Sequence, residues 1–258
     1  MAKIIAIANQ KGGVGKTTTA VNLSSCLAIA EKKTLLVDID PQANACSGLG
    51  YTRENGRKSI YQALINQEKA ENLLCPTKIK WLDLIPSDIH LIGAEIELIS
   101  AHEREYRLKQ ALRQIEGRYE FIIIDGPPSL GLLTINALSA SDSVLIPLQC
   151  EYYALEGISQ LLNTIKLIKR ELNPKLQIEG VLLTMFDQRT SISHQVAKEV
   201  HDHFKGTVFS TIIPRNVSLS EAPSHGIPAI LYEVRSSGAQ AYLRLAKEVM
   251  NNVQKGLR

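Results

Sequence analysis

One segment near the start of the chain limits the possible folds more than any other. The apolar run Ile4–Ala8 leads into QKGGVGKTTT at residues 10–19, and helix-forming residues follow. Glycines permit the tight turn in which successive backbone N–H groups point at one anion, and the start of a helix adds the positive end of its dipole. A strand, this loop and a helix in that order form a P-loop, which predicts an α/β fold and a nucleotide site.

The end of this loop carries the side chains that a triphosphate requires. The ammonium group of Lys16 is expected to reach the β- and γ-phosphates, and the hydroxyl group of Thr17 to bind Mg²⁺. ATP and Mg²⁺ are therefore the predicted cofactors. The predicted nucleotide contacts of the loop are Lys11, Gly12, Gly13, Val14, Gly15, Lys16, Thr17 and Thr18.

Further apolar runs recur along the chain with helix-length segments between them. Such runs are typical of strands buried on both faces of a parallel sheet, so the alternation predicts a doubly wound α/β fold with a mostly parallel sheet. We find no linker and no internal repeat, and expect residues 1–258 to form one domain. The predicted strands are Ile4–Ala8, Thr34–Val37, Trp81–Ile85, Phe121–Ile124, Ser143–Pro147 and Val181–Met185. The predicted helices are Lys16–Ala30, Ile60–Ile65, Arg104–Ile115, Leu155–Leu172, Ser191–Phe204 and Gly238–Val253, and 50–79 is otherwise read as a loop.

Acidic residues follow two of the predicted strands. Asp38 and Asp40 end the run LLVDID, and Asp125 ends the run FIIID. The carboxyl ends of parallel strands share the edge of the sheet at which the P-loop lies. We expect Asp38 and Asp125 to bind hydrated Mg²⁺, and Asp40 to orient the water that attacks the γ-phosphate. Gly126 would let the backbone approach the γ-phosphate and so distinguish ATP from ADP.

The loop departs from the usual P-loop at two positions. Gln10 replaces the first glycine, and Lys11 adds a second lysine. One ATP site needs only one such ammonium group, so the side chain of Lys11 could instead extend to a neighbouring molecule. The alternative is an exposed lysine with no special role. The sequence shows no obvious arginine finger, so intrinsic hydrolysis is expected to be slow.

Composition excludes few classes of protein, but the cysteine content indicates a reducing compartment. The formal net charge is only +3, so a role with nucleic acid would need local clusters of basic residues. The cysteines Cys26, Cys46, Cys75 and Cys150 have no C-x-x-C spacing, which gives no support for a zinc or iron–sulfur site. Scattered thiols are typical of the reducing cytoplasm.

Several motifs together resemble the ParA/Soj-type partition ATPases, a group with a deviant Walker A loop. The first three motifs, residues 11–19, 37–48 and 124–131, are shared with the wider MinD/ParA superfamily. Two further motifs are specific to the Soj-like branch: QCEYYALEG at 149–157, and the segment from IPRNV at 213 to SEAPSHG at 226. The resemblance covers nearly the whole chain.

The resemblance implies a cycle of assembly and release. ATP binding would form a sandwich homodimer that binds double-stranded DNA without sequence preference on the nucleoid, and a ParB-type centromere-binding protein would trigger hydrolysis. Lys11 would cross the dimer interface, Lys16 and Asp40 would support hydrolysis, and Pro214 and Arg215 would lie near adenine. A membrane partner is not expected.

DNA binding without sequence preference needs basic residues that face phosphates. Relatives commonly carry a basic residue between Val217 and Leu219, whereas this chain has Ser218. Each candidate could equally be an ordinary charge on a solvent-exposed helix face. The candidates are Arg189, Lys198, Arg215, Arg235, Arg244 and Lys247.

Three other functions are compatible with the same fold. A MinD-like membrane-associated ATPase would end in a basic amphipathic helix, and residues 241–253 do have apolar side chains at helical spacing. Packing of this helix on the core is the simpler interpretation. An electron-transfer ATPase would need cysteine ligands in glycine-rich segments, which surround neither Cys75 nor Cys150. A small-molecule ligase would need a separate substrate pocket, for which the sequence gives no sign.

Overall fold

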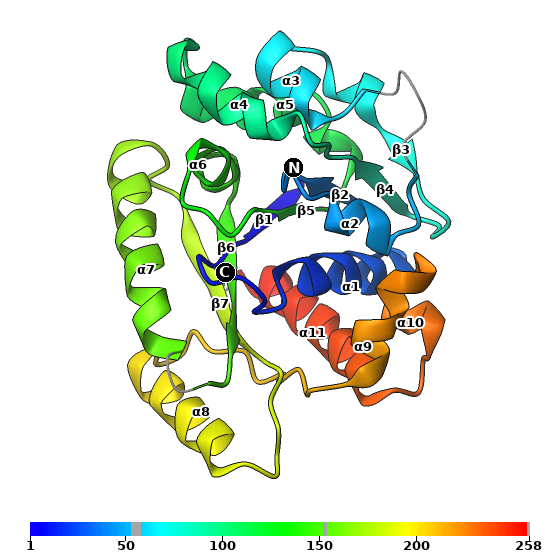
Figure 1. The fold of residues 1–258 in the computed structure, drawn as a ribbon, viewed down its shortest axis with the longest axis vertical. Helices are drawn as coiled ribbons and strands as arrows, with labels where there is room; N and C mark the ends of the chain where they lie inside the picture. The colour runs from blue at the N-terminus through cyan, green and yellow to red at the C-terminus, as the bar shows by residue number, and fades with distance from the viewer. Residues whose placement is uncertain (53–57, 152–153, 257–258) are drawn as a thin grey trace.

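The computed structural model describes residues 1–52, 58–151 and 154–256, and this part of the chain forms a seven-stranded sheet between helices (Figure 1). The strand order is β3-β4-β2-β5-β1-β6-β7. All neighbouring strands are parallel except β3 and β4. The doubly wound, mostly parallel sheet predicted from the sequence is confirmed. The strands are β1 (Lys3–Ile7), β2 (Thr34–Asp38), β3 (Cys75–Pro76), β4 (Leu82–Ile85), β5 (Phe121–Asp125), β6 (Ser143–Gln149) and β7 (Gln177–Thr184).

Two hydrophobic cores lie on the two faces of this sheet. Ile4 and Ala6 of β1 belong to one core, and Ile5 and Ile7 belong to the other, because successive side chains of a strand point to opposite faces. The first core is covered by α3 (Ile60–Asn66), α4 (Leu91–Glu97), α5 (Arg107–Arg113), α6 (Leu132–Ala140), α7 (Ala154–Glu171) and α8 (Ser191–His203). The second is covered by α1 (Lys16–Ile29), α2 (Asn44–Gly48), α9 (Val217–Glu221), α10 (Ala229–Tyr232) and α11 (Ser237–Gln254).

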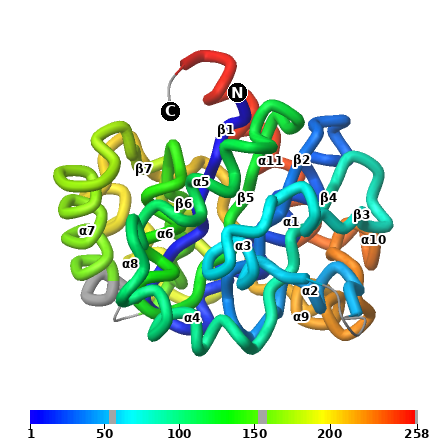
Figure 2. The backbone as a smooth tube through the Cα atoms, turned by 90° about the horizontal axis from the view of Figure 1, so that it is seen from above, coloured from blue at the N-terminus to red at the C-terminus, as the bar shows by residue number. Residues whose placement is uncertain are grey.

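The strand order fixes where a ligand can bind. Strand β1 lies between β5 and β6, with the strands that follow it in the chain divided between its two sides. In open α/β sheets such a reversal leaves a crevice at the carboxyl ends of the strands. The loop between β1 and α1 and the ends of β2 and β5 meet at this edge, which Figure 2 shows from a second direction.

Most predicted elements are present, with shifted ends. Strand β7 begins at Gln177, four residues before the predicted start, because its polar residues find partners inside the sheet. Glu179 is fully buried and accepts a hydrogen bond from the hydroxyl of Ser143 at 2.6 Å, and it lies 3.2 Å from the ammonium of Lys3. The helix predicted over Arg104–Ile115 is wrong as one element, since a short 3₁₀ turn at Arg104–Tyr106 precedes α5.

Other elements were missed for a physical reason. The sequence of α6 is apolar on nearly every side and almost every residue in it is buried, so it has no amphipathic pattern to detect. The segment read as a loop also contains a 3₁₀ turn at Ala70–Leu73 and strand β3, while its predicted helix is α3, capped by the side chains of Ser59 and Gln62. The short helices α2, α4, α9 and α10 were not predicted either.

The C-terminal helix α11 packs on the molecule. Tyr242, Leu245 and Val249 on its apolar face are buried in the second core. Its apolar spacing therefore reflects internal packing, which is the simpler of the two interpretations given above. In the described part of the chain, we find no helix with the length and apolar character needed to cross a bilayer.

Candidate functional site

The loop between β1 and α1 has the backbone of an anion-binding site. Gly13 and Gly15 adopt left-handed φ angles of 74° and 89°, which side chains other than glycine rarely adopt. Helix α1 begins directly afterwards at Lys16, and its N-cap residue, Gly15, has no side chain that could cap the first N–H groups. These N–H groups and the positive end of the helix dipole point to a ligand with negative charge.

Two residues that the sequence analysis did not identify hold this loop in place. Asn9 accepts a hydrogen bond from the N–H of Lys11 at 2.9 Å, and its amide donates to the carbonyl of Pro147 in β6 at 2.7 Å. Thr184, at the end of β7, donates to the carbonyl of Val14 at 2.9 Å. A polar residue at the end of an apolar strand was the available signal for Asn9. Nothing in the sequence links Thr184 to the loop.

Lys16 lies at the centre of the site. Its ammonium group donates to the carbonyl oxygen of Lys11 at 3.0 Å, and only 7% of the residue is exposed. Burial lowers the pKa of Lys16, and the nearby carboxylates of Asp125 and Asp40 partly offset that effect. The structure thus brings together the lysine and two of the acidic residues that the sequence predicted to act together.

Asp125 is a buried carboxyl group whose charge has little compensation within the described chain. It is fully buried, and it lies opposite Asp38 in the register of β2 and β5. Within the described chain neither carboxylate oxygen has a hydrogen bond of normal geometry, although the hydroxyl of Thr17 is close enough to lower the pKa. Burial and the charge of Asp38 outweigh this effect and raise the pKa of Asp125 well above its usual range. A carboxylate in this position fits a divalent cation, because the cation would compensate the buried charge.

Asp38 is held more tightly than Asp125. One of its oxygens accepts the N–H of Asp40, and the other accepts both the N–H and the thiol of Cys46, all at 3.1 Å. Burial raises the pKa of Asp38 to about 6 despite these hydrogen bonds. Asp38 is therefore both a neighbour of Asp125 and the residue that fixes helix α2 to β2.

Asp40 lies just beyond the end of β2. Its side chain accepts a hydrogen bond from the N–H of Gln42 at 3.0 Å, and its carbonyl oxygen accepts one from the hydroxyl of Ser87. Only 6% of Asp40 is exposed. Gly126, the first residue after Asp125, is also buried, and a side chain there would meet the carbonyl of Ile7 at an ordinary contact distance of 3.5 Å. The roles predicted for Asp40 and Gly126 stay predictions.

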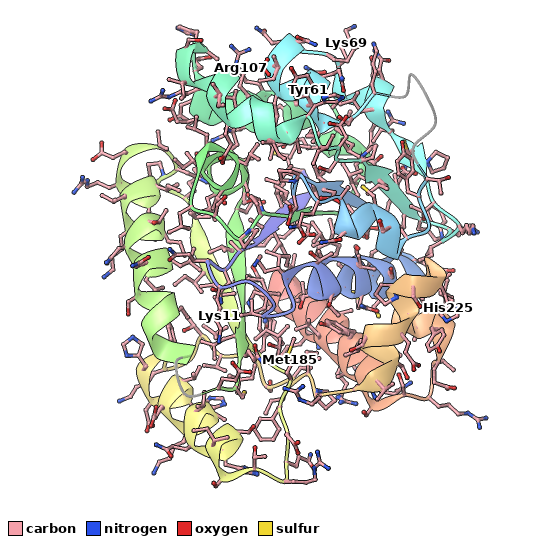
Figure 3. All side chains as sticks on the ribbon, in the orientation of Figure 1. Lys11, Tyr61, Lys69, Arg107, Met185 and His225 are labelled. Atoms are coloured by element: carbon pink, nitrogen blue, oxygen red, sulfur yellow. The ribbon has the colours of Figure 1, made fainter. Side chains whose placement is uncertain are left out.

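Lys11 has a partner within its own chain. Its ammonium group lies 3.0 Å from a carboxylate oxygen of Glu151, just after β6, and the two side chains are 38% and 48% exposed. In Figure 3 the labelled Lys11 lies near the centre of the view, away from the outer edge of the molecule. Ion pairs this exposed contribute little to stability, so Lys11 can exchange Glu151 for another anion. Tyr152 and Tyr153, quoted in the same motif, lie outside the described residues.

A pocket beside the loop has the position expected for a nucleoside. The predicted residues Pro214 and Arg215 line it together with Gly15 and Thr18 of the phosphate loop. Tyr242 of α11 lines it too, and its hydroxyl lies 3.1 Å from that of Thr19, a contact that the sequence did not reveal. The remaining lining residues are Thr184, Met185, Ile213, Asn216, Leu219 and Ser220.

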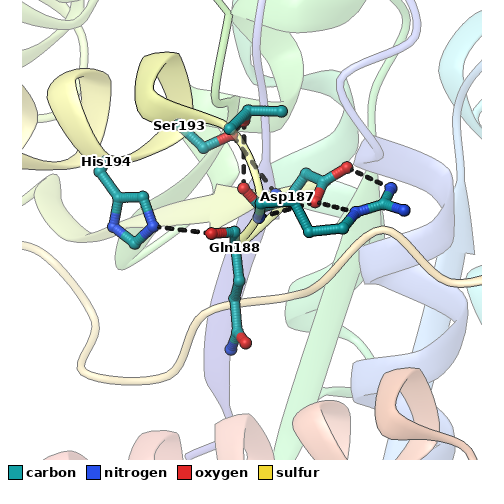
Figure 4. A network of polar contacts seen from close by, with 6 residues as sticks. Asp187, Gln188, Ser193 and His194 are labelled. Atoms are coloured by element: carbon teal, nitrogen blue, oxygen red, sulfur yellow. Dashed lines mark hydrogen bonds and ion pairs between the residues drawn. The ribbon is translucent and has the colours of Figure 1, made fainter.

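The six candidate DNA contacts are all exposed, but two of them have other roles. Arg189 is paired with Asp187 at 2.7 Å in the turn between β7 and α8, where a network of polar contacts fixes the backbone (Figure 4). Arg215 lines the pocket beside the phosphate loop. The other candidates lie on α8, on α11 and in the turn before α11: Lys198, Arg235, Arg244 and Lys247.

Comparison with known proteins places this geometry in context. A family model described as an AAA domain matches residues 2–178. The chain is 60% identical to the sporulation initiation inhibitor protein Soj of Bacillus subtilis, over 98% of this chain and 100% of that protein. It is 58% identical to the chromosome partitioning protein ParA of Myxococcus xanthus, over 96% of this chain and 88% of that protein.

A solved structure shows the same fold with a nucleotide. Cobyrinic acid a,c-diamide synthase from Mycobacterium smegmatis, with bound ADP and magnesium, matches with a TM-score of 0.87 and 36% identity, and the match covers 99% of this chain and 97% of that one. That protein is named as a small-molecule enzyme, one of the classes left open by the sequence, but its identity to this chain is well below that of the Soj and ParA relatives.

Proposed function

The chain belongs to the ParA/Soj family of chromosome-partitioning ATPases, and we propose that it is an ATP-dependent switch that partitions DNA. One observation carries the proposal. The match to Soj spans 98% of this chain, so it extends past the AAA match at residue 178 over the segment of Pro214 and Arg215, which share a pocket with Gly15 and Thr18 of the phosphate loop. The matched region therefore spans every segment that lines the proposed nucleotide site.

In this proposal Mg²⁺ and ATP bind at the carboxyl edge of the sheet. The N–H groups of the loop and of the first turn of α1 hold the phosphates, and Lys16 moves from the carbonyl of Lys11 to the β- and γ-phosphates. Thr17, Asp38 and Asp125 would hold the magnesium ion through oxygen ligands. Bound magnesium would neutralise phosphate charge as the terminal phosphate leaves. The buried carboxylate of Asp125, which has no hydrogen bond of normal geometry within the described chain, supports this arrangement.

Asp40 is the residue that we assign to hydrolysis. It is held in place by the N–H of Gln42, near Lys16, and its carboxylate would orient water for attack in line with the leaving ADP. Without an arginine finger the intrinsic rate is slow, and a ParB-type centromere-binding protein accelerates it. Hydrolysis then releases the protein from DNA.

Dimer formation and DNA binding complete the proposed cycle in the cytoplasm, on the nucleoid. The weak partner Glu151 would release Lys11 to contact the nucleotide of a second copy. Two copies together would double the exposed basic residues Lys198, Arg235, Arg244 and Lys247, and so strengthen binding to phosphates. The DNA surface must work without a basic side chain at Ser218.

The central test is sedimentation of the wild-type protein and an Asp40→Ala variant with Mg²⁺ and ATP, with and without duplex DNA. We expect Asp40→Ala to stay dimeric and bound to DNA, because loss of the group that assists the attacking water slows hydrolysis at least about a hundredfold. DNA binding should weaken steeply as salt is raised.

A matched control is Asp202→Ala, which removes an exposed carboxylate from α8. This variant should assemble and turn over like the wild type. A monomeric Asp40→Ala protein that does not bind DNA in ATP would contradict both the dimer and the role assigned to Asp40.

A further inference from the structure

Helix α4 and the turns beside it carry an exposed row of isoleucines. The fractions exposed are 59% for Ile89, 60% for Ile92, 72% for Ile96 and 61% for Ile99. Their spacing of three, four and three residues places them on one side of the helix. We name these four residues the isoleucine strip. No other segment of the described chain has four exposed large hydrophobic side chains so close together.

The opposite side of the same segment is apolar as well. Leu91, Ala94 and Leu98 are fully buried in the first core. A helix that is apolar on both sides is expected to be covered on both sides. In a single copy of this chain the core covers one side only, so the isoleucine strip indicates a partner surface rather than an ordinary exposed face.

The strip lies at the edge of the sheet that carries the phosphate site. Strand β4 is parallel to β2, and β2 to β5 and β1, so all four end at this edge, and α4 begins just after β4. Figure 2 shows α4 along the lower border of the molecule, where the loop between β1 and α1 also lies. A protein that docks over this loop is therefore positioned to cover α4 as well.

Helix α4 also contacts the segment that follows Asp125. The carboxylate of Glu95 lies so close to Gly131 that a Cβ atom there would be 2.0 Å from an oxygen of Glu95. Asp125 is the last residue of β5, and Gly131 immediately precedes α6, so residues 126–131 connect the two elements. A shift of residues 126–131 on nucleotide binding would therefore displace α4 and its strip.

We propose that the isoleucine strip is covered by a second copy of this chain in the ATP-bound dimer, an inference that rests on the dimer of the proposed function. Lys11 reaches a second copy only if that copy faces the carboxyl edge of the sheet, and the strip lies on this edge. A standard interface buries about 800 Å² per partner. Four isoleucines supply part of that area, and the loops of the nucleotide site supply the remainder.

The test uses a cysteine as a probe of access. All four native cysteines are buried, so Ile96→Cys introduces an exposed thiol. The change is made in the Asp40→Ala protein, which is expected to accumulate as the ATP dimer. We expect alkylation of Ile96→Cys to become at least ten times slower when Mg²⁺ and ATP are added, with dimer formation measured by sedimentation in the same sample.

The matched control is Leu167→Cys on α7, whose leucine is 53% exposed and lies away from the nucleotide edge. Its alkylation rate should not change with ATP. A confirmed dimer in which Ile96→Cys reacts as fast as in the monomer would overturn the inference and leave the proposed function intact. Absence of any ATP dimer in the Asp40→Ala protein would refute both.

A second variant tests whether the isoleucine strip contributes to the affinity of dimerisation, rather than whether the dimer covers it. Ile92→Asn with Ile96→Asn, in the same background, should weaken ATP-dependent dimerisation at least tenfold while the affinity of the monomer for Mg²⁺ and ATP stays unchanged. Normal dimerisation in this background, with loss of activation by the ParB-type partner when the same two changes are made in the wild-type chain, would show that the strip binds that partner instead and would count against a second copy.

Discussion

At the scale of single residues, the site holds two carboxyl groups in a buried environment that disfavours their charged form. Asp125 is buried without a hydrogen-bond partner of normal geometry in the described chain, and Asp38 lies opposite it in the neighbouring strand. The pKa of each carboxyl is raised by burial. Such an arrangement destabilises the protein without ligands and prepares it to bind a cation, a trade of stability for function.

This arrangement predicts an unusual pH dependence. A carboxyl whose pKa is raised by folding binds more protons in the native state than in the unfolded state, so the free energy of unfolding falls as pH rises through the native pKa. For Asp38 this window extends from its ordinary value of 3.8 to about 6, and burial raises the pKa of Asp125 in the same direction. Without nucleotide, the stability contributed by Asp38 should therefore decline from about pH 4 to about pH 6, and the buried Asp125 should add to the decline.

Asp125→Asn is the corresponding test. Removal of the buried charge should raise the Tm of the nucleotide-free protein at pH 7.5 by a few degrees, since about 1 kcal/mol shifts Tm by roughly 2–4 °C at this size. The difference from the wild type should shrink at pH 5. Thermal unfolding across this pH range measures both effects. A lower Tm for Asp125→Asn at pH 7.5 would contradict the assignment of an uncompensated charge.

At the scale of elements, two loops far apart in the sequence are joined through glycines. Gly50 follows α2, and Gly226 ends the 3₁₀ turn at Ala222–His225 that precedes α10. Both have left-handed φ angles, of 69° and 63°. A Cβ atom at Gly226 would lie 2.7 Å from the Cα of Gly50, and one at Gly50 would lie 2.6 Å from the carbonyl oxygen of Gly226. Only glycine at both positions allows this contact.

Gly226→Ala should therefore destabilise the protein by about 1–3 kcal/mol, from strain in φ and from a clash between the two backbones. Gly206→Ala separates these causes, because Gly206 has a φ of 76° but an added Cβ there meets no atom within 4 Å. Urea unfolding of both variants gives the two free energies. An equal loss in both would mean that the φ angle alone decides, and that the contact with Gly50 is unimportant.

At the scale of the whole molecule, the proposed dimer depends on one side chain. Lys11 is expected to exchange Glu151 for the nucleotide of a second copy, so Lys11→Ala should bind Mg²⁺ and ATP as a monomer and fail to dimerise. Sedimentation with ATP measures self-association, and calorimetry measures nucleotide binding.

The structure offers a closely matched control for this change. Lys32 pairs with Glu120 at 2.9 Å, with side chains 35% and 49% exposed, close to the values for Lys11 and Glu151. Lys32→Ala should dimerise normally. Unchanged dimerisation of Lys11→Ala would remove the main support for a sandwich in which this lysine crosses between copies.

The sequence by itself determined the local chemistry and the class of fold. A strand, a glycine-rich loop and a helix form a phosphate site from contiguous residues, and buried parallel strands have a recognisable apolar pattern, so the P-loop, the acidic strand ends and most of the sheet could be read directly. The single domain predicted for residues 1–258, and the roles of individual site residues, stay predictions.

Only the tertiary structure decided which residues from distant segments of the chain meet at the site. Thr184 holds the carbonyl of Val14, Pro214 joins Gly15 at one pocket, and Glu151 pairs with Lys11, in each case across more than a hundred residues of chain. The same holds for α6 and the isoleucine strip, because a segment apolar on all sides has no periodicity that shows which face meets the core. Packing makes that choice, and it leaves Ile92 and Ile96 exposed beside the nucleotide edge.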